Sequence, residues 1–160
     1  MAELILMRHA AAVPAAENAS DFERPLSSRG RAAAALAARQ LSRSGVELDR
    51  LLYSPARRTH ETASILAREL ALDPAALQAL PDLYAAEPRA IRAGIQHHHA
   101  HATTLLVVGH NPGISDFGRE LANGLVPAHL PTAGYWRLRF DAQDWRQWLR
   151  GEAARAQPLS

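Results

Sequence analysis

Two short apolar segments that each lead to a histidine constrain this chain more than any other feature. Residues 4–7 are followed by Arg8 and His9, and residues 105–108 are followed, after one glycine, by His110. Uninterrupted apolar runs of this length are typical of central strands that are buried on both faces. In an open α/β sheet, ligands bind at the carboxyl ends of the strands. The pattern therefore predicts that Arg8, His9 and His110 meet at one edge of a sheet.

Helical patterns separate the expected strands. Ser27 is a favourable N-cap for a helix that runs to about residue 44. Other helices are expected at about 56–71, from 88 onward, after 113 and around 145–149, and other strands at about 49–54 and 133–140. Residues 77–83 fit either a short strand or an extended loop. This alternation predicts a three-layer α/β/α sandwich with a largely parallel central sheet.

The length and composition narrow the possible classes of protein. A chain of 160 residues without an internal repeat or linker predicts one domain over residues 1–160, with a frayed tail from about residue 153. There is no cysteine, which excludes disulfides, thiolate metal ligands and cysteine nucleophiles. All 18 basic residues are arginines dispersed among acids, so we expect no nucleic-acid partner. Without a membrane-length apolar segment or a signal-peptide pattern, we expect a cytoplasmic protein with no membrane association.

A third strand end adds positive charge to the same edge. Ser54 and Pro55 lead into a helix whose first turn carries Arg57 and Arg58. A helix N-terminus with a cation beside it binds anions. Guanidinium groups also offer paired donors that match phosphate oxygens. Two arginines and two histidines at one sheet edge therefore predict a dianionic phosphoryl group as the ligand.

These segments together resemble the histidine phosphatase superfamily, which has the phosphoglycerate mutase-like fold. The motifs, in chain order, are Arg8-His9-Ala10, Ser54-Pro55-x-x-Arg58-x-x-x-Thr62-Ala63 and Gly109-His110. Two further features make the chain most similar to the SixA-like phosphohistidine phosphatases, namely Arg24-Pro25-Leu26-Ser27-x-x-Gly30 and Gly109-His110-Asn111-Pro112-Gly113. The resemblance extends from Leu4 to about Trp148.

The resemblance implies an enzyme that removes phosphate from histidine in phosphoproteins without a metal or other cofactor. His9 would be the nucleophile and would form a covalent phosphohistidine intermediate. Arg8, Arg58 and His110 would bind the phosphoryl oxygens and stabilise the charge of the transition state. We expect Arg24 at the rim of the substrate pocket. Arg57 points about 100° away from its neighbour on a helix, which favours Arg58.

The general acid is less clearly marked. Many superfamily members use a carboxylate from the region that corresponds to residues 80–83, where Asp82 is a possible general acid and Glu87 a second candidate. The SixA-like branch is similar in lacking a clear acid. A protonated imidazole is a good leaving group, so a phosphohistidine substrate demands less of an enzymatic acid than an alkyl phosphate does.

A run of histidines, His97, His98, His99 and His101, follows the third expected helix. Histidine clusters can bind metals. Consecutive side chains at a helix end fan around the helix axis, however, and do not converge on one point. We therefore predict no metal site there.

Two other functions compete with the phosphohistidine phosphatase. One is a phosphatase of small phosphomonoesters, and the other is a phosphate-binding regulatory module without turnover. The complete set of Arg8, His9, Arg58 and His110 argues against the second. The short chain leaves little length for a lid, which favours an open site that admits a protein side chain, for example from a histidine-phosphorylated signalling domain.

Overall fold

The computed structural model describes residues 1–16 and 19–159. It contains a sheet with the strand order β3-β2-β4-β1-β5-β6. The strands, in chain order, are β1 (Ala2–Arg8), β2 (Arg50–Tyr53), β3 (Leu77–Ala79), β4 (Thr104–Gly109), β5 (Tyr135–Phe140) and β6 (Gln157–Pro158). The helices are α1 (Ser28–Arg43), α2 (Arg57–Glu69), α3 (Pro88–His98), α4 (Gly113–Leu121) and α5 (Ala142–Leu149). Short 3₁₀ turns cover Asp21–Glu23, Pro74–Ala76 and Pro81–Leu83.

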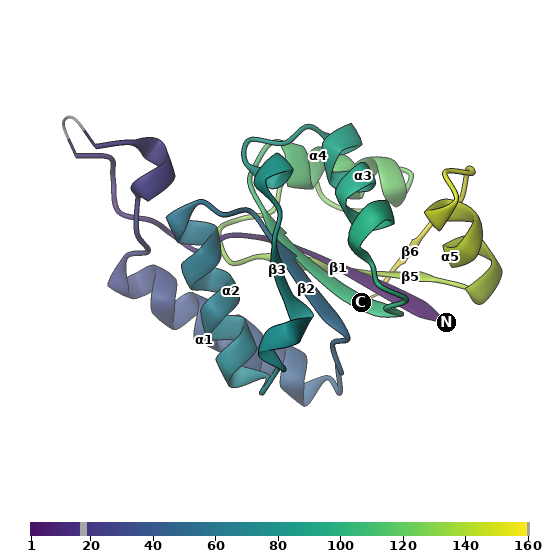
Figure 1. Cartoon of the computed structure of the whole chain (residues 1–160), viewed down its shortest axis with the longest axis horizontal. Helices are drawn as coiled ribbons and strands as arrows, with labels where there is room; N and C mark the ends of the chain where they lie inside the picture. The colour runs from purple at the N-terminus through teal and green to yellow at the C-terminus, as the bar shows by residue number, and fades with distance from the viewer. Residues whose placement is uncertain (17–18, 160) are drawn as a thin grey trace.

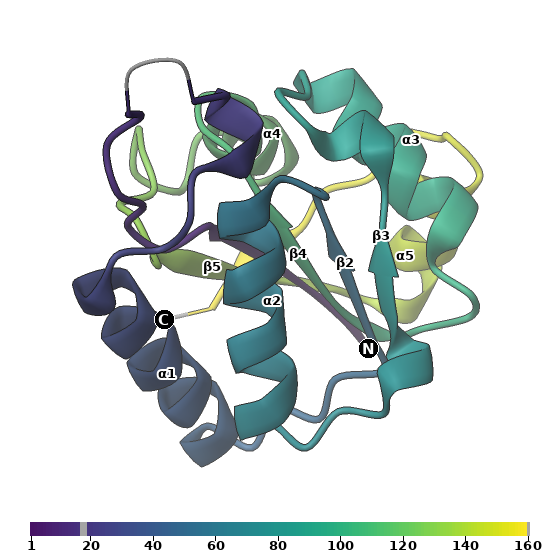
Figure 2. The same cartoon turned by 60° about the vertical axis from the view of Figure 1, so that its left-hand side comes forward.

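Helices cover both faces of this sheet (Figures 1 and 2). Strands β3, β2, β4 and β1 are parallel, and β5 runs antiparallel to β1. Helices α1 and α2 pack on one face, and α3, α4 and α5 pack on the other. The predicted three-layer α/β/α sandwich with a largely parallel sheet is confirmed.

The register between β1 and β4 determines where their polar ends lie. The apolar residues of β1 alternate between the two faces, with Leu4 and Leu6 packed under α3–α5 and Ile5 and Met7 under α1 and α2. Burial on both faces explains why the run has no polar residue. Arg8 pairs with Gly109 across the two strands, so the residues that follow each strand emerge side by side.

Local signals account for several element boundaries. The Ser27 hydroxyl accepts a hydrogen bond from the Gly30 amide at 3.0 Å, which confirms it as the N-cap of α1. Of the ambiguous residues 77–83, the first three form β3, and residues 81–83 form a 3₁₀ turn. The indoles of Trp145 and Trp148 on α5 are buried in the core.

The C-terminal segment differs from the prediction. Gln157 and Pro158 pair with β5, and the amide of Ala156 donates to the carbonyl oxygen of Leu121 at 3.2 Å. A frayed tail is predicted from about residue 153, whereas the structure places residues 157 and 158 in the sheet. Backbone hydrogen bonds and the burial of Ala156 attach this segment to the rest of the domain. A strand of two residues is too short to be recognised from alternating side chains in the sequence. In the part of the chain that the structure describes, no helix combines the length and apolarity required to cross a membrane.

Candidate active site

Four predicted side chains come together at the carboxyl edge of the parallel strands. Arg8 ends β1 and His9 follows it, His110 follows β4, and Arg58 lies in the first turn of α2. His9, Arg58 and His110 are 9%, 7% and 8% exposed, and the two imidazole centroids are 5.3 Å apart. Three ionisable side chains are therefore buried against one another at the end of the sheet.

Arg58 links the two histidines. Its Nε donates to His9 Nε2, and its Nη2 donates to His110 Nδ1, both at 3.3 Å. Arg57 instead is exposed and pairs with Glu61 on the same helix at 3.0 Å. The structure thus separates the two neighbouring arginines in the way that helix geometry predicts.

The hydrogen bonds of His9 define its tautomer. Nδ1 lies 2.7 Å from the carbonyl oxygen of Ala10, which can only accept, so Nδ1 carries the proton. Nε2 then holds a lone pair on the side of Arg58. Burial lowers the pKa of His9 to about 4, and the positive charges of Arg58, Arg8 and Arg24 add to this effect, while the bond to Ala10 opposes it. His9 is therefore a neutral base at pH 7.

His110 has the opposite tautomer. Because Arg58 donates to Nδ1, the proton lies on Nε2, which is 2.8 Å from the hydroxyl oxygen of Ser54. Burial lowers the pKa of His110 to about 3, with the charge of Arg58 as the next cause. Ser54 thus fixes the ring of a second neutral histidine beside His9.

Arg8 is directed along the same edge. Its Nη1 donates to the carbonyl oxygen of Leu130 at 3.3 Å, and the same oxygen accepts from Asn111 at 2.9 Å. The Nε of Arg8 is buried and has no acceptor among the described residues. Burial lowers the pKa of Arg8. A buried cationic donor without a protein acceptor suits an anionic ligand.

Asp21 and Tyr84 are members of the site that sequence reasoning missed. Asp21 Oδ2 accepts from Arg58 Nη2 at 3.0 Å and from the Tyr84 hydroxyl at 2.8 Å. Oδ1 accepts from Arg24 at 3.0 Å. These hydrogen bonds, from Tyr84 first and then Arg24, lower the pKa of Asp21 to about 2. The one available signal was an acid in the loop that precedes Arg24, opposite an edge rich in arginines.

Arg24 lies at the periphery of the site. Its Nε donates to the carbonyl oxygen of Val13 at 2.9 Å, and its Nη1 pairs with Asp21. The side chain is 28% exposed. Arg24 therefore holds the loop around Asp21, and its charge contributes to the lowered pKa of His9.

Both candidate acids line one groove, but only Glu87 reaches a second. Asp82 is exposed in a 3₁₀ turn and lines a groove of about 650 Å³ beside α3. Glu87 also lines a second groove, of about 820 Å³, which has His110 in its wall. Of the two carboxylates, only Glu87 shares a groove with one of the buried histidines.

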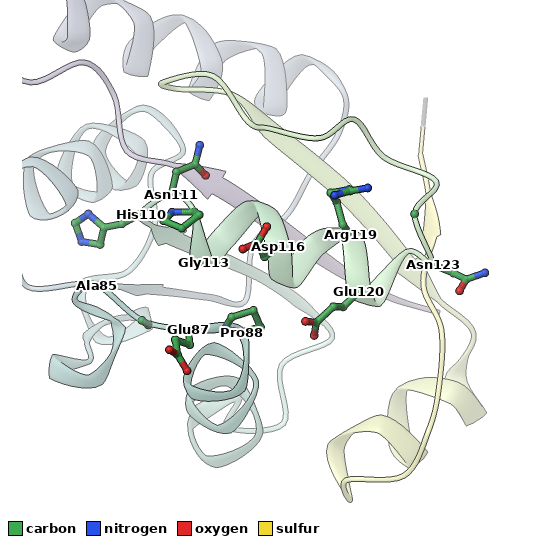
Figure 3. A pocket seen from close by; sticks show the side chains of 13 residues that line it. Ala85, Glu87, Pro88, His110, Asn111, Gly113, Asp116, Arg119, Glu120 and Asn123 are labelled. Carbon is green, nitrogen blue, oxygen red and sulfur yellow. The ribbon is translucent and has the colours of Figure 1, made fainter.

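The groove beside His110 runs between α4 and residues 85–88. Figure 3 shows His110 at one end, Glu87 on one wall and Asp116, Arg119 and Glu120 on α4. The two walls meet closely at Gly113, where a Cβ atom would lie 1.8 Å from the carbonyl oxygen of Ala86. A groove lined by both apolar and charged residues thus extends from His110 along α4.

The histidine run lies away from this cluster. His98 Nδ1 is 3.1 Å from the amide nitrogen of Gln78, and His99 Nδ1 accepts from the amide of His101 at 3.0 Å. Within residues 1–16 and 19–159, no group of three or more His, Cys, Asp or Glu side chains is placed to hold a metal ion.

Comparisons with known proteins agree with this geometry. Residues 4–87 match the family model of the histidine phosphatase superfamily, branch 1. An uncharacterized protein of Picosynechococcus sp. (strain ATCC 27264 / PCC 7002 / PR-6) is 34% identical over 148 residues, which cover 88% of this chain and 86% of that protein.

Solved structures extend the similarity to nearly the whole chain. The protein histidine phosphatase SixA complexed with tungstate matches with a TM-score of 0.80 and 26% identity, over 99% of this chain and 94% of that one. A candidate phosphohistidine phosphatase SixA from Nakamurella multipartita matches with a TM-score of 0.75 and 27% identity, over the same shares of 99% and 94%. The phosphoglycerate mutase-like fold and the SixA-like similarity are confirmed, and the chain belongs to the histidine phosphatase superfamily.

Proposed function

We propose that this protein is a phosphohistidine phosphatase that acts on histidine-phosphorylated proteins through a covalent intermediate on His9. Membership of the superfamily implies phosphatase activity. The observation that supports the nucleophile is the neutral His9 ring, whose Nε2 lone pair faces the Arg58 guanidinium. An amine-type nucleophile must be unprotonated to attack, and burial keeps His9 in that state.

The reaction follows from these groups. His9 Nε2 attacks phosphorus while the bond from phosphorus to the substrate imidazole breaks, and that imidazole takes a proton from solvent water and leaves as a neutral ring. Water then attacks the phosphohistidine of the enzyme, releases inorganic phosphate and restores His9. Arg8 and Arg58 stabilise the negative charge on the equatorial oxygens in both steps. His110 can donate to the same oxygens from Nδ1 once the bound phosphoryl dianion favours its protonated form. Water is the only co-substrate of the two steps, and the groups that meet the phosphoryl charge are side chains of this chain.

The surroundings of the site support a protein substrate. The groove of about 820 Å³ that begins at His110 offers room for the polypeptide next to a phosphorylated side chain. Among the described residues, no carboxylate forms a hydrogen bond with His9 or His110. A phosphoramidate tolerates this arrangement because its imidazole leaves readily once protonated. The likeness to the protein histidine phosphatase SixA points to the same substrate class.

A phosphatase of small phosphomonoesters is the second candidate. The observation that favours it is Glu87, which shares the groove with His110 and could protonate an alkoxide leaving group. In that case, the groove would hold the rest of a small ester.

Two measurements test the proposal. The purified protein should hydrolyse a histidine-phosphorylated phosphotransfer protein faster, by kcat/KM, than any member of a panel of alkyl phosphates. Rapid quenching in base with ³²P-labelled substrate should place the label on His9, and His9→Ala should fold but neither acquire label nor turn over. Label on another residue would overturn the nucleophile assignment, and faster turnover of an alkyl phosphate would overturn the substrate class.

A further inference from the structure

We propose that Asp21 is a positioning residue, which holds the Arg58 guanidinium so that one particular edge of it faces the phosphoryl group. This inference rests on the proposed function because it concerns the same site. It assigns a role to a loop carboxylate that contacts neither histidine through a hydrogen bond in the described part of the chain.

The contacts of Arg58 divide between two edges of its planar guanidinium. A guanidinium offers a side edge formed by Nε and Nη2 and an end edge formed by Nη1 and Nη2. The side edge meets His9 Nε2 and His110 Nδ1, both at 3.3 Å. The end edge meets Asp21, with Nη1 donating to its carbonyl oxygen at 2.7 Å and Nη2 to its Oδ2 at 3.0 Å.

The unequal lengths of these contacts indicate which edge is anchored. The bonds to Asp21 are shorter, and one of them joins the guanidinium to a carboxylate, so that both donor and acceptor are charged. The contacts with the neutral histidines are long and readily replaced. An arriving phosphoryl group can therefore take the side edge, between His9 and His110, while Asp21 keeps the end edge. Without the Asp21 carboxylate, the end edge keeps only its bond to the backbone carbonyl oxygen of residue 21, and the guanidinium is held less firmly in this orientation.

Asp21 is itself held from two directions. Tyr84 donates to Oδ2 at 2.8 Å, and Arg24 donates to Oδ1 at 3.0 Å. The Tyr84 ring also packs edge-on against Phe22 at 5.1 Å and His110 at 5.5 Å between centroids. The Asp21 carboxylate is thus held by Arg24, which precedes α1, and by Tyr84, which precedes α3. A carboxylate with a fixed position can in turn fix the orientation of the Arg58 guanidinium.

The charge of Asp21 has a second consequence that separates positioning from simple binding. A carboxylate beside the site repels a phosphate anion, so it weakens ground-state binding of the ligand. If Asp21 orients Arg58 for the transition state, its loss should lower kcat without weakening the binding of inorganic phosphate. A residue that merely supports the fold would show a different pattern, in which kcat falls, phosphate binding weakens and thermal stability declines together.

The experiment compares Asp21→Ala, Asp21→Asn and a control, Asp49→Asn. Asp49 accepts hydrogen bonds from Thr103 and Thr104 at the start of β4, at the opposite end of the strand from His110. We expect Asp21→Ala to lower kcat for the phosphohistidine protein by roughly 10- to 100-fold. The inhibition constant of inorganic phosphate should stay unchanged or fall. Asp21→Asn should recover part of kcat because its amide oxygen still accepts a hydrogen bond, and Asp49→Asn should lower the melting temperature but not kcat.

An NMR measurement follows the guanidinium directly. The ¹⁵N–¹H signal of Arg58 Nε, assigned by its loss in Arg58→Ala, should broaden or shift in Asp21→Ala and remain unchanged in Asp49→Asn. An unchanged signal in Asp21→Ala, an unchanged or raised kcat, or a fall in kcat accompanied by weaker phosphate binding would each overturn the inference. Absence of phosphohistidine turnover in the unmodified protein would refute the proposed function alone, because the Nε signal tests the Asp21–Arg58 contact without turnover.

Discussion

The Nε of Arg58 donates to Nε2 of His9 at 3.3 Å, the nitrogen that we propose attacks phosphorus. The contact aligns a permanent positive charge with the nucleophile and helps to keep the imidazole neutral. Arg58 also reaches His110 at the same distance. A phosphoryl group that enters between the rings would exchange these long contacts for charge-assisted hydrogen bonds, which are the stronger kind.

The adjacent arginines of α2 provide a matched test of this arrangement. Arg58→Ala should lower kcat/KM for a phosphohistidine protein by roughly 10²-fold or more, because it removes donors from the transition-state oxygens. Arg57→Ala removes the same kind of side chain one position earlier, where it is exposed and pairs with Glu61. That variant should change kcat/KM by less than about threefold, in keeping with a surface ion pair. Equal losses in both variants would contradict the assignment.

The lowered histidine pKa values predict that stability depends on pH. His9 and His110 have pKa values of about 4 and about 3 in the folded protein, against about 6.5 in an unfolded chain. Below pH 6.5 the unfolded state therefore binds more protons, and the free energy of unfolding falls as the pH decreases toward the folded values. Between pH 7 and pH 5, urea titrations should show a loss of about 2 kcal/mol for each histidine.

Two variants identify which groups make the free energy of unfolding depend on pH. His9→Ala should have a clearly smaller dependence on pH over the same interval, since one of the two buried rings is gone. His60→Ala, which changes an exposed ring on α2, should retain the full dependence. If His9→Ala left the pH dependence of the unfolding free energy unchanged, other groups would be its cause.

The two carboxylates near the site distinguish the candidate substrates. Asp82→Asn and Glu87→Gln should each change phosphohistidine turnover by much less than the roughly 10²–10⁴-fold expected for loss of a general acid. On an alkyl phosphate, Glu87→Gln should have the larger effect, because Glu87 and not Asp82 shares the groove with His110. A loss of phosphohistidine turnover in either variant by more than 10²-fold would show that the substrate imidazole does need an enzymatic acid.

Treatment with a chelator should leave the rate unchanged. The proposed site stabilises phosphoryl oxygens with guanidinium groups, where metal-dependent phosphatases hold their ions with carboxylates and histidines. The measurement is kcat before and after dialysis against EDTA, with and without added Mg²⁺ or Zn²⁺. If kcat fell with EDTA, and if it were also low in a variant that lacks His97, His98, His99 and His101, the histidine run would have a role in binding a metal.

The sequence was sufficient to predict the parts of the site that depend on regular structure. Strand burial gave continuous apolar runs, and the residues that follow these runs, His9 and His110, lie together because the parallel strands end at the same edge. Arg58 could be placed because helix geometry separates it from Arg57. These predictions needed only the periodicity of strands and helices.

The parts that were missed depend on tertiary contacts. Asp21 and Tyr84 belong to irregular segments that no periodic pattern describes, and they meet only because both segments pack at the strand ends. The pairing of Gln157 and Pro158 with β5 is made by backbone groups. Every residue has a backbone carbonyl group, and every residue but proline has a backbone N–H. Side-chain sequence therefore contains little information about such a pairing.

The position of β1 in the sheet also has a consequence for how the protein is made. Both neighbours of β1, namely β4 and β5, come from the second half of the sequence, and the partners Leu4 and Leu105 are separated by most of the chain. During synthesis on the ribosome, the apolar strand that precedes His9 leaves the exit tunnel long before any strand that can pair with it. Until β4 has been synthesised, the nascent chain exposes an unpaired apolar segment that is prone to aggregation and that chaperones can bind.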